Sequence, residues 1–301
     1  MPKKLTGVVI GPSGIGKAHI RELIHFGFRN ICLVGKNFEK DRLNLFKIEY
    51  KNTNFFNLKS ISEIKKKKPS IINLCSPTKF HFKQILIIKS FCKHLVIEKP
   101  IFWLKDGQSN LKKVKNLLKS KNNKIFVNLP MISLASQIKK KIRIRKIHKF
   151  NFSYFTKGKN EFENIPIDLL PHALSFLFTL NFNKIRSYEI LKVIKKKNSW
   201  NCKLMINECL CKFLFKQNSK RKKNLLSFRI NQDFFLRKQF INNNIYINKV
   251  IKNNNKLIDL KNPMSDYLNL IFTNLNKNKM LLKNNDIVIN STKIMEKLIN
   301  Y

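Results

Sequence analysis

The stretch GPSGIGKAH (11–19), near the start of the chain, contains the glycines and the lysine that are typical of loops that bind phosphate groups. Gly11, Gly16 and Lys17 fit G-x-x-x-x-G-K, the first part of the loop that cradles the phosphates of ATP or GTP. The same glycines fit the turn of a dinucleotide-binding domain, where free N–H groups at a helix start face a pyrophosphate. The stretch therefore allows either nucleotide-triphosphate chemistry with Mg²⁺ or hydride transfer with a nicotinamide.

The residue after the lysine favours the second chemistry. A phosphate loop needs Ser or Thr there, because that hydroxyl binds Mg²⁺, and this chain has Ala18. The buried run SIINLCS (70–76) also ends without the carboxylate that would hold the metal. The dinucleotide pattern G-x-G-x-x-G has one departure, Ser13 at its middle position, with Gly14 beside it. We therefore expect a dinucleotide turn.

A second set of reactive side chains lies on an apolar segment, NIPIDLLPHALSFLFTL (164–180). Asp168 and His172 are four residues apart and share one face of a helix, and Ser175 and Thr179 continue the polar stripe. Histidine suits a general base because its pKa lies near neutrality, and a carboxylate can orient it. Such a stripe is typical of a polar cavity; the alternative is an Asp–His pair satisfied in the core.

The elements that must position these residues change in character near residue 130. Before it, short apolar runs alternate with helical patterns. Strands are predicted at 6–11, 30–35, 52–57, 70–76, 94–100 and 124–130, and helices at 15–27, 60–68, 80–91 and 107–121. This alternation indicates an α/β domain with a Rossmann-type, doubly wound parallel sheet. Ligands bind such sheets beyond the carboxyl ends of the strands.

The second half has the pattern of an α+β domain with a largely antiparallel open sheet. Strand-like runs fall at 144–158, 184–196, 200–215, 224–232 and 240–250, and helices at 164–180, 263–275 and 290–300. We divide the chain into a dinucleotide-binding domain, 1–126, and a substrate-binding and oligomerisation domain, 127–301.

The charge is unusual, with 61 Lys and Arg against 17 Asp and Glu and a formal net charge of +44. Such a balance is found in nucleic-acid-binding proteins, but here the lysines are spread along the whole chain. Lys, Asn and Ile are abundant together, which favours a compositional bias, so nucleic acid is not the expected partner. No apolar run has membrane-spanning length, and the six cysteines form no C-x-x-C pair. We expect a cytoplasmic protein with reduced core thiols and no metal site.

Four segments, taken in order, resemble the Gfo/Idh/MocA family of glucose–fructose oxidoreductase and inositol dehydrogenase. They are Gly11–His19, Ser76–His81, Glu98–Pro100 and Asp168–His172, which match G-x-G-x-x-G-x-x-H, (T/S)-P-x-x-x-H, E-K-P and D-x-x-x-H. The resemblance implies an NAD(P)-dependent dehydrogenase or reductase that moves a hydride between the nicotinamide and a sugar, polyol or sugar derivative. It also implies a homodimer or homotetramer.

The same resemblance implies roles for particular residues. It makes Lys99, Asp168 and His172 catalytic, without dividing the roles of base and substrate ligand between Lys99 and His172. It implies cofactor binding by Gly11, Ser13, Gly14, Ile15, Gly16, Lys36, Ser76, Pro77, His81, Glu98 and Lys99.

Two positions depart from the family pattern. The second strand ends in Gly35, followed by Lys36, where an NAD-binding domain carries a carboxylate for the ribose 2′-hydroxyl. NADP is therefore at least as well suited as NAD. Ser175 stands where the family often has Asp, three residues after the histidine. The alternative function is a catalytically inactive relative that binds a nucleotide or sugar as a sensor or partner.

Overall fold

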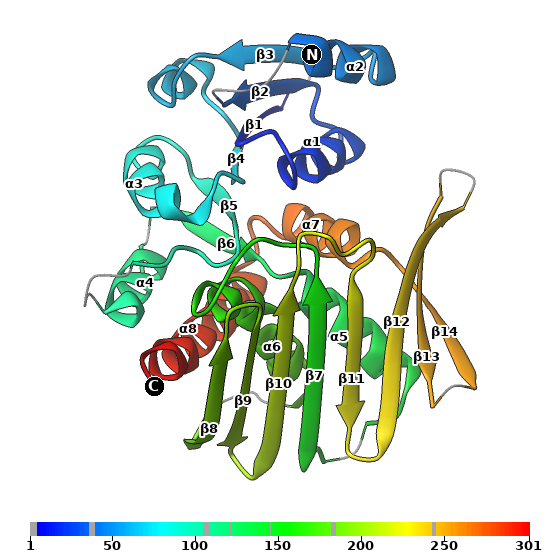
Figure 1. Cartoon of the computed structure of the whole chain (residues 1–301). Coiled ribbons are helices and arrows are strands. Elements are labelled where there is room, and N and C mark those ends of the chain that lie inside the picture. Colours follow the sequence, from blue (N-terminus) through cyan, green and yellow to red (C-terminus); the bar gives the residue numbers. More distant parts are fainter. Residues whose placement is uncertain are drawn as a thin grey trace. The chain divides into compact units, whose positions relative to one another are not determined.

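A computed structural model describes residues 5–35, 40–104, 109–120, 122–144, 146–181, 185–242, 245–253 and 255–301. The chain forms two compact units, each with its own sheet (Figure 1). The first unit comprises Met1–Asn128 and Tyr267–Asp286, and the second comprises Leu129–Asp266 and Ile287–Tyr301. The division thus falls after residue 128, and a late segment of the chain packs with the first unit.

The first unit contains a six-stranded sheet in the order β3-β2-β1-β4-β5-β6, and all of its neighbouring strands are parallel. Its strands are β1 (Thr6–Ile10), β2 (Asn30–Val34), β3 (Asn54–Leu58), β4 (Ile71–Leu74), β5 (His94–Glu98) and β6 (Lys124–Asn128). The strands other than β3 are almost wholly buried, which suits their Val- and Ile-rich runs. The predicted doubly wound sheet is confirmed.

Helices connect these parallel strands, as crossover connections require. They are α1 (Gly16–His25), α2 (Lys40–Glu49), α3 (Thr78–Ile88) and α4 (Asn110–Leu118), with a 3-10 helix, η1 (Ser62–Lys67), between β3 and β4. The helix predicted at 60–68 is this shorter 3-10 turn, which ends at Lys68 in the left-handed conformation (φ 45°). The segment is rich in lysine, and the residue that it buries is Ile64.

The late segment of the first unit covers β6, the edge strand of the sheet. It contains most of α7 (Pro263–Thr273) and the start of α8 (Asn278–Asn300). The Asn284 amide accepts from Val127 N at 3.0 Å and donates to Val127 O at 2.8 Å, so it acts as a one-residue substitute for a neighbouring strand. The Phe272 ring packs edge-on against Phe26 at 5.4 Å. These contacts explain why the unit is discontinuous in sequence.

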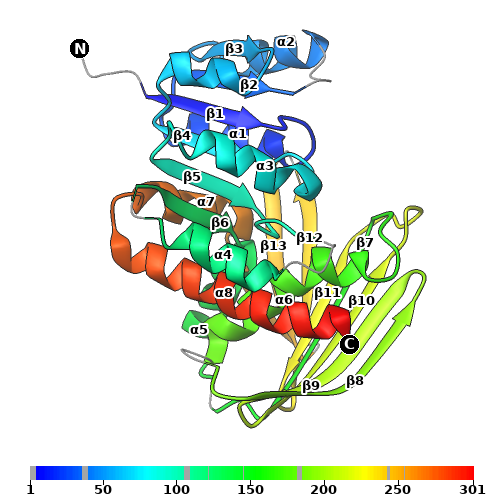
Figure 2. The ribbon, with the colours of Figure 1, turned by 90° about the vertical axis from the view of Figure 1, so that its left-hand side faces the viewer.

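The second unit contains an eight-stranded sheet in the order β14-β13-β12-β11-β7-β10-β9-β8. Its strands are β7 (Lys149–Thr156), β8 (Tyr188–Lys196), β9 (Ser199–Ile206), β10 (Cys209–Gln217), β11 (Leu225–Ile230), β12 (Asp233–Asn242), β13 (Ile245–Lys252) and β14 (Lys256–Leu260). All neighbours are antiparallel except β7 and β10. Helices α5 (Pro130–Lys141) and α6 (Asn164–Asn181) lie on one face (Figure 2). The predicted α+β architecture is confirmed.

The inner face of this sheet, which α6 covers, changes from apolar to polar along the strands. One row of paired residues is aromatic, with Phe213, Phe152, Phe228 and Phe235 on β10, β7, β11 and β12. Further along these strands, and on the neighbouring β13, the inward side chains become polar. They are Tyr154, Thr156, Gln217, Arg237, Gln239, Tyr246 and Asn248, which we call the polar end of the inner face. Among the described residues, no helix combines the length and apolarity needed to cross a bilayer.

Candidate active site

The turn after β1 is shaped by two glycines that leave no room for a side chain. Gly11 has φ +80°, and a Cβ there would lie 2.6 Å from Ser76 N, at the end of β4. A Cβ on Gly16 would collide with the carbonyl oxygen of Gly11. Both glycines are therefore required by close backbone approach, and they set α1 directly behind the turn.

This turn presents unused N–H groups toward solvent at the start of α1. Within the described part of the chain, the N–H groups of Ser13, Gly14 and Ile15 donate no hydrogen bond, whereas Gly16 N donates to Ser13 O at 2.9 Å. All three residues are exposed, and no atom lies within 4 Å of a Cβ built on Gly14. Three free amides at the positive end of a helix dipole fit a pyrophosphate. The residues present thus suit a dinucleotide.

As far as residue 35, where the described residues stop, the end of β2 carries no side chain for a ribose hydroxyl. Gly35 is exposed, but a Cβ there would lie 2.8 Å from Cδ of Pro12, and Gly11 N ties the turn to β2 through Val34 O at 2.8 Å. The rigid proline ring therefore excludes a side chain at position 35. Lys36, predicted to bind the cofactor, lies outside the described residues.

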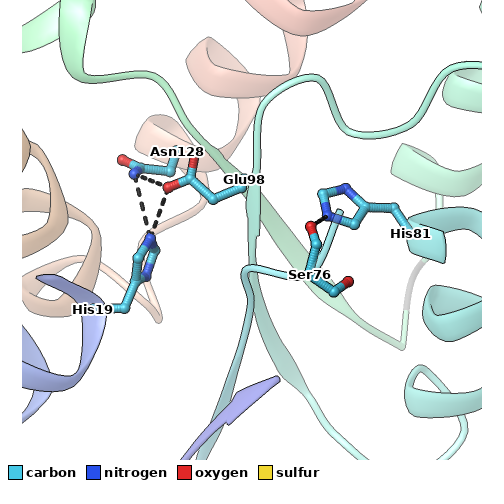
Figure 3. A network of polar contacts seen from close by, with 5 residues as sticks. All are labelled: His19, Ser76, His81, Glu98 and Asn128. Atoms are coloured by element: carbon cyan, nitrogen blue, oxygen red, sulfur yellow. Dashed lines mark hydrogen bonds and ion pairs between the residues drawn. The ribbon is translucent and has the colours of Figure 1, made fainter. Parts of the chain in front are cut away.

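Ser76, Pro77 and His81 lie at the end of β4 and the start of α3. Figure 3 shows the ring of His81 against the Ser76 carbonyl, with Nε2 2.7 Å from that oxygen, and Nδ1 lies 3.1 Å from Ile101 O. Burial lowers the pKa of His81, which favours the neutral ring that donates from one nitrogen only. His81 thus joins the loop after β4 to the segment after Pro100, and both loops border the carboxyl ends of the strands.

Glu98, the last residue of β5, is buried in a contact that the sequence did not predict (Figure 3). Its Oε1 lies 2.8 Å from Nε2 of His19 on α1 and accepts a hydrogen bond of 2.6 Å from Nδ2 of Asn128 at the end of β6. Burial alone would raise the pKa of Glu98, but the hydrogen bond and charge of His19, then Asn128 and Lys99, lower it overall. An ionised carboxylate therefore ties three elements together. We call His19, Glu98 and Asn128 the Glu98 clamp.

Lys99 follows this clamp directly, and a cis peptide bond joins it to Pro100. Its side chain is half-buried, and its charge contributes to the lowered pKa of Glu98. The candidate catalytic lysine therefore directly follows, in the chain, a carboxylate that His19 and Asn128 hold in place.

In the second unit, Asp168 is held by the polar end of the inner face. Its Oδ2 accepts from Gln217 Nε2 at 2.7 Å and from Asn160 Nδ2 at 3.3 Å, and Gln217 Oε1 accepts from Asn160 N at 3.1 Å. Gly158 permits this arrangement, because a Cβ there would collide with the Gln217 amide. The carboxylate is thus fixed by an amide on β10, which the sequence did not indicate.

His172 lies one helical turn beyond Asp168 and packs edge-on against Tyr154 of β7, with ring centroids 5.6 Å apart. It is half-buried. The other two residues of the polar stripe form hydrogen bonds with the backbone of the same helix. Ser175 Oγ donates to His172 O at 3.2 Å, and Thr179 Oγ1 donates to Ser175 O at 2.7 Å. Both hydroxyls are buried and bonded within α6, so Asp168 and His172 are the reactive part of the stripe.

The predicted residues therefore form two groups. In the first unit, the glycine turn, Ser76, Pro77, Glu98 and Lys99 gather at the carboxyl ends of β1, β4 and β5. In the second, Asp168 and His172 share a face of α6. Among the described residues, no three His, Cys, Asp or Glu side chains are arranged to hold a metal ion, and all six cysteines are buried and unpaired.

Comparison with known proteins places the first unit. Residues 5–129 match the profile of a family described as an oxidoreductase family with an NAD-binding Rossmann fold. This part of the chain thus matches the family model of the Gfo/Idh/MocA oxidoreductases. The matched residues include the turn at Gly11–Gly16 and the segment Glu98–Pro100 described above. A search of curated proteins finds no match to the chain.

Solved structures of similar fold span both units. A dehydrogenase from Clostridium difficile is 17% identical, with a TM-score of 0.70 and 99% of each chain covered. A UDP-N-acetylglucosamine 3-dehydrogenase from Acidithiobacillus ferrooxidans is 10% identical, with a TM-score of 0.68 and 99% of each chain covered. A 3-ketoreductase from Actinomadura kijaniata, in complex with NADP and TDP-benzene, is 10% identical, with a TM-score of 0.68 and 98% and 97% covered. At these identities the likeness shows that the chain shares the fold of these structures along its length.

Proposed function

We propose that this protein is an NAD(P)-dependent dehydrogenase or reductase that acts on a CH–OH group of a sugar, polyol or sugar derivative. The observation that carries the proposal is the exposed turn at the start of α1, with the unused N–H groups of Ser13, Gly14 and Ile15. A pyrophosphate is the ligand chemistry that these three donors and the helix dipole suit best.

The reaction we propose uses the candidate residues Lys99, Asp168 and His172. When bound, the nicotinamide exchanges a hydride with the substrate carbon. In the direction of alcohol oxidation, His172 takes the hydroxyl proton, and Asp168, held by Gln217, orients and stabilises the histidine as it becomes charged. Lys99 donates a hydrogen bond to the substrate oxygen. We assign the base to His172 because Asp168 lies one helical turn before it and, held by Gln217, can orient the ring.

The cofactor we favour is NADP. The exclusion of a side chain at Gly35 by Pro12 leaves the end of β2 without a carboxylate that would repel a 2′-phosphate. The substrate class is supported by two structural neighbours whose names refer to sugar chemistry, the UDP-N-acetylglucosamine 3-dehydrogenase and the 3-ketoreductase. We also propose a homodimer or homotetramer, since the eight-stranded sheet has a face without helices (Figure 1). The six buried, unpaired thiols suit the cytoplasm.

The proposal is tested by titrating the purified protein with NADPH, NADH and Mg-ATP while following nucleotide fluorescence and the melting temperature. We expect saturable stabilisation by NADPH, weaker stabilisation by NADH and none by Mg-ATP. Sugars and polyols are then screened for turnover, and Lys99→Ala and His172→Ala should each lower kcat by at least roughly 100-fold without changing the NADPH affinity. Stabilisation by Mg-ATP alone would contradict the dinucleotide site. Tight NADPH binding without turnover of any sugar would favour the inactive relative.

A further inference from the structure

Arg237 is a buried cation without a carboxylate partner. It lies on β12 at the polar end of the inner face, and 9% of its surface is exposed. Its Nε donates to Asn248 Oδ1 at 2.7 Å. No Asp or Glu in the described part of the chain lies within ion-pair distance of it. Amides satisfy its donors, but nothing described there neutralises its charge.

The neighbours of the guanidinium among the described residues are amides and tyrosines. The Gln239 amide lies against both the guanidinium and the Tyr246 hydroxyl, and with its oxygen turned to Arg237 it accepts from that side chain. Tyr154 and Tyr246 are the other polar neighbours, and both interact electrostatically with Arg237. The Thr156 hydroxyl, on the same face, is buried and has no hydrogen-bond partner in the described residues. The polar end thus holds unneutralised positive charge and an unused hydroxyl.

Burying a charge is unfavourable unless an opposite charge or a ligand compensates it. The choice of residue is also unusual, because the chain has nine arginines against 52 lysines. Lysine is a mobile point charge, whereas the planar arginine fork binds both oxygens of a carboxylate or phosphate. A compositional excess of lysine therefore does not account for an arginine at this position.

The strand register connects Arg237 to the candidate catalytic residues. Leu226 of β11 pairs with Tyr154 on one side and with Arg237 on the other, so Tyr154 and Arg237 lie two strands apart on the inner face. Two strand spacings are about 10 Å. His172 packs against Tyr154. The distance from Arg237 to His172 is therefore about the length of a substituted sugar, and both residues lie in the second unit.

We propose that Arg237 binds a carboxylate or phosphate group of the substrate, so that the substrate is an anionic sugar derivative. The inference rests on the proposed function, because it takes the reacting carbon to lie at His172. Asn248 and Gln239 hold the guanidinium in place, and the Thr156 hydroxyl is a further donor for the ligand. A purely structural role, in which Arg237 only joins β12 to β13 through Asn248, is the alternative that the test must separate.

The test measures sugar affinity by thermal shift with NADPH present. Glucose is the uncharged probe, glucuronate the carboxylate and glucose 6-phosphate the phosphate. We expect at least one charged probe to bind the wild type more tightly than glucose does. The charged probe with the higher affinity identifies the anionic group of the substrate as a carboxylate or a phosphate. Arg237→Met should weaken that binding by roughly 10- to 100-fold, the effect of losing a charge-assisted hydrogen bond, and leave glucose unchanged. Lys238→Met is the matched control, since this exposed neighbour loses the same charge on the opposite face of β12.

Arg237→Lys covers the case in which the methionine variant does not fold. It retains the charge without the fork, and we expect a weaker preference for the charged probe than in the wild type. The inference is wrong if glucose and both charged probes bind the wild type equally. It is also wrong if a folded Arg237 variant melts at a lower temperature but keeps the full preference. Wild type that binds NADPH but prefers no anion overturns this inference alone, whereas failure to bind NADPH overturns the proposed function.

Discussion

At the scale of single residues, Pro12 and Gly35 show how one side chain decides the identity of another. The sequence presents Gly35 as a missing carboxylate. The structure adds the physical cause, because a Cβ at that position would lie only 2.8 Å from Cδ of Pro12. The glycine and the proline are thus complementary, and an acidic residue at 35 requires a smaller residue at 12.

This complementarity predicts the behaviour of a double-mutant cycle. Gly35→Asp alone should lower the free energy of unfolding by about 1–3 kcal/mol, because the new Cβ overlaps Pro12. Pro12→Ala combined with Gly35→Asp should recover most of that stability and shift the ratio of dissociation constants from NADPH toward NADH. Urea denaturation and fluorescence titration measure the two effects. Additive effects of the two substitutions would show that the residues do not interact.

Gln217 allows a second prediction at this scale. Its amide holds Asp168, so Gln217→Ala should release the carboxylate without removing any reacting group. We expect kcat to fall by roughly 10-fold with little change in the NADPH affinity, whereas Gln217→Glu should be worse because it sets two carboxylates together. Steady-state kinetics with the sugar identified in the screen measure both. Gln217→Ala with an unchanged kcat would show that Asp168 does not need this support.

At the scale of elements, the Glu98 clamp joins α1, β5 and β6 at the ends of the two strands. His19 and Asn128 lie on different elements, yet both bind the same carboxylate oxygen. The clamp fixes the end of β5, and Lys99 is the next residue along the chain. The position of the candidate catalytic lysine therefore depends on helix and strand packing rather than on the E-K-P segment alone.

The clamp makes stability depend on pH in a defined direction. The folded-state pKa of Glu98 is lowered, so the stability it provides is present above the unfolded carboxyl value of about 4.3 and is lost as pH falls through the lower folded value. Glu98→Gln should lower the free energy of unfolding by about 1–3 kcal/mol at pH 7, and the difference from wild type should shrink below about pH 4. Urea denaturation between pH 7 and pH 3.5 measures it.

The matched control for this pH dependence is Glu49→Gln. Glu49 lies in the same unit and pairs with Arg21 at 3.8 Å, but both side chains are about half exposed. Such surface pairs contribute little to stability, so its curve should follow the wild type at every pH. Parallel curves for wild type and Glu98→Gln down to pH 3.5 would contradict a lowered pKa at Glu98.

At the scale of the whole molecule, the positive charge is spread over both units. The compositional interpretation predicts that DNA retention reflects total charge and not one surface. Replacing the four lysines at 65–68 or the run KRKK at 220–223 by glutamine removes the same charge from different units. Both variants should elute from a DNA column at the same, slightly lower salt concentration. A much larger effect of one replacement would identify a nucleic-acid-binding surface.

The fold follows from the sequence where periodicity is clear, as in the buried parallel strands and α6. The prediction from sequence fails where one apolar run covers parts of two elements. The run at 240–250 reads as one strand but spans the end of β12 and most of β13, and 200–215 is the hairpin of β9 and β10. α5 and β14 were not predicted. The strand predicted at 124–130 includes Pro130, which is in fact the first residue of α5, where proline is favoured. The five residues of β14 are too few for a clear alternation.

The site divides in the same way. Motifs located the strand ends and the Asp168–His172 pair, because those residues lie close together in sequence. The residues that hold these groups could not be predicted from motifs, because they lie far away in sequence. Asn128 is 30 residues from Glu98, and Gln217 is 49 residues from Asp168. Arg237 is recognised only by its burial. Such partners follow from strand order and register, which sequence periodicity does not supply.

The discontinuity of the first unit has a consequence during translation. The ribosome makes Phe26, Phe28 and Val127 early, but Phe272 and Asn284, which cover them, are synthesised only after the whole eight-stranded sheet. The nascent Rossmann domain therefore emerges with an open sheet edge and an uncovered aromatic surface. We therefore expect this surface to stay open to chaperones until residues 267–286 have left the exit tunnel.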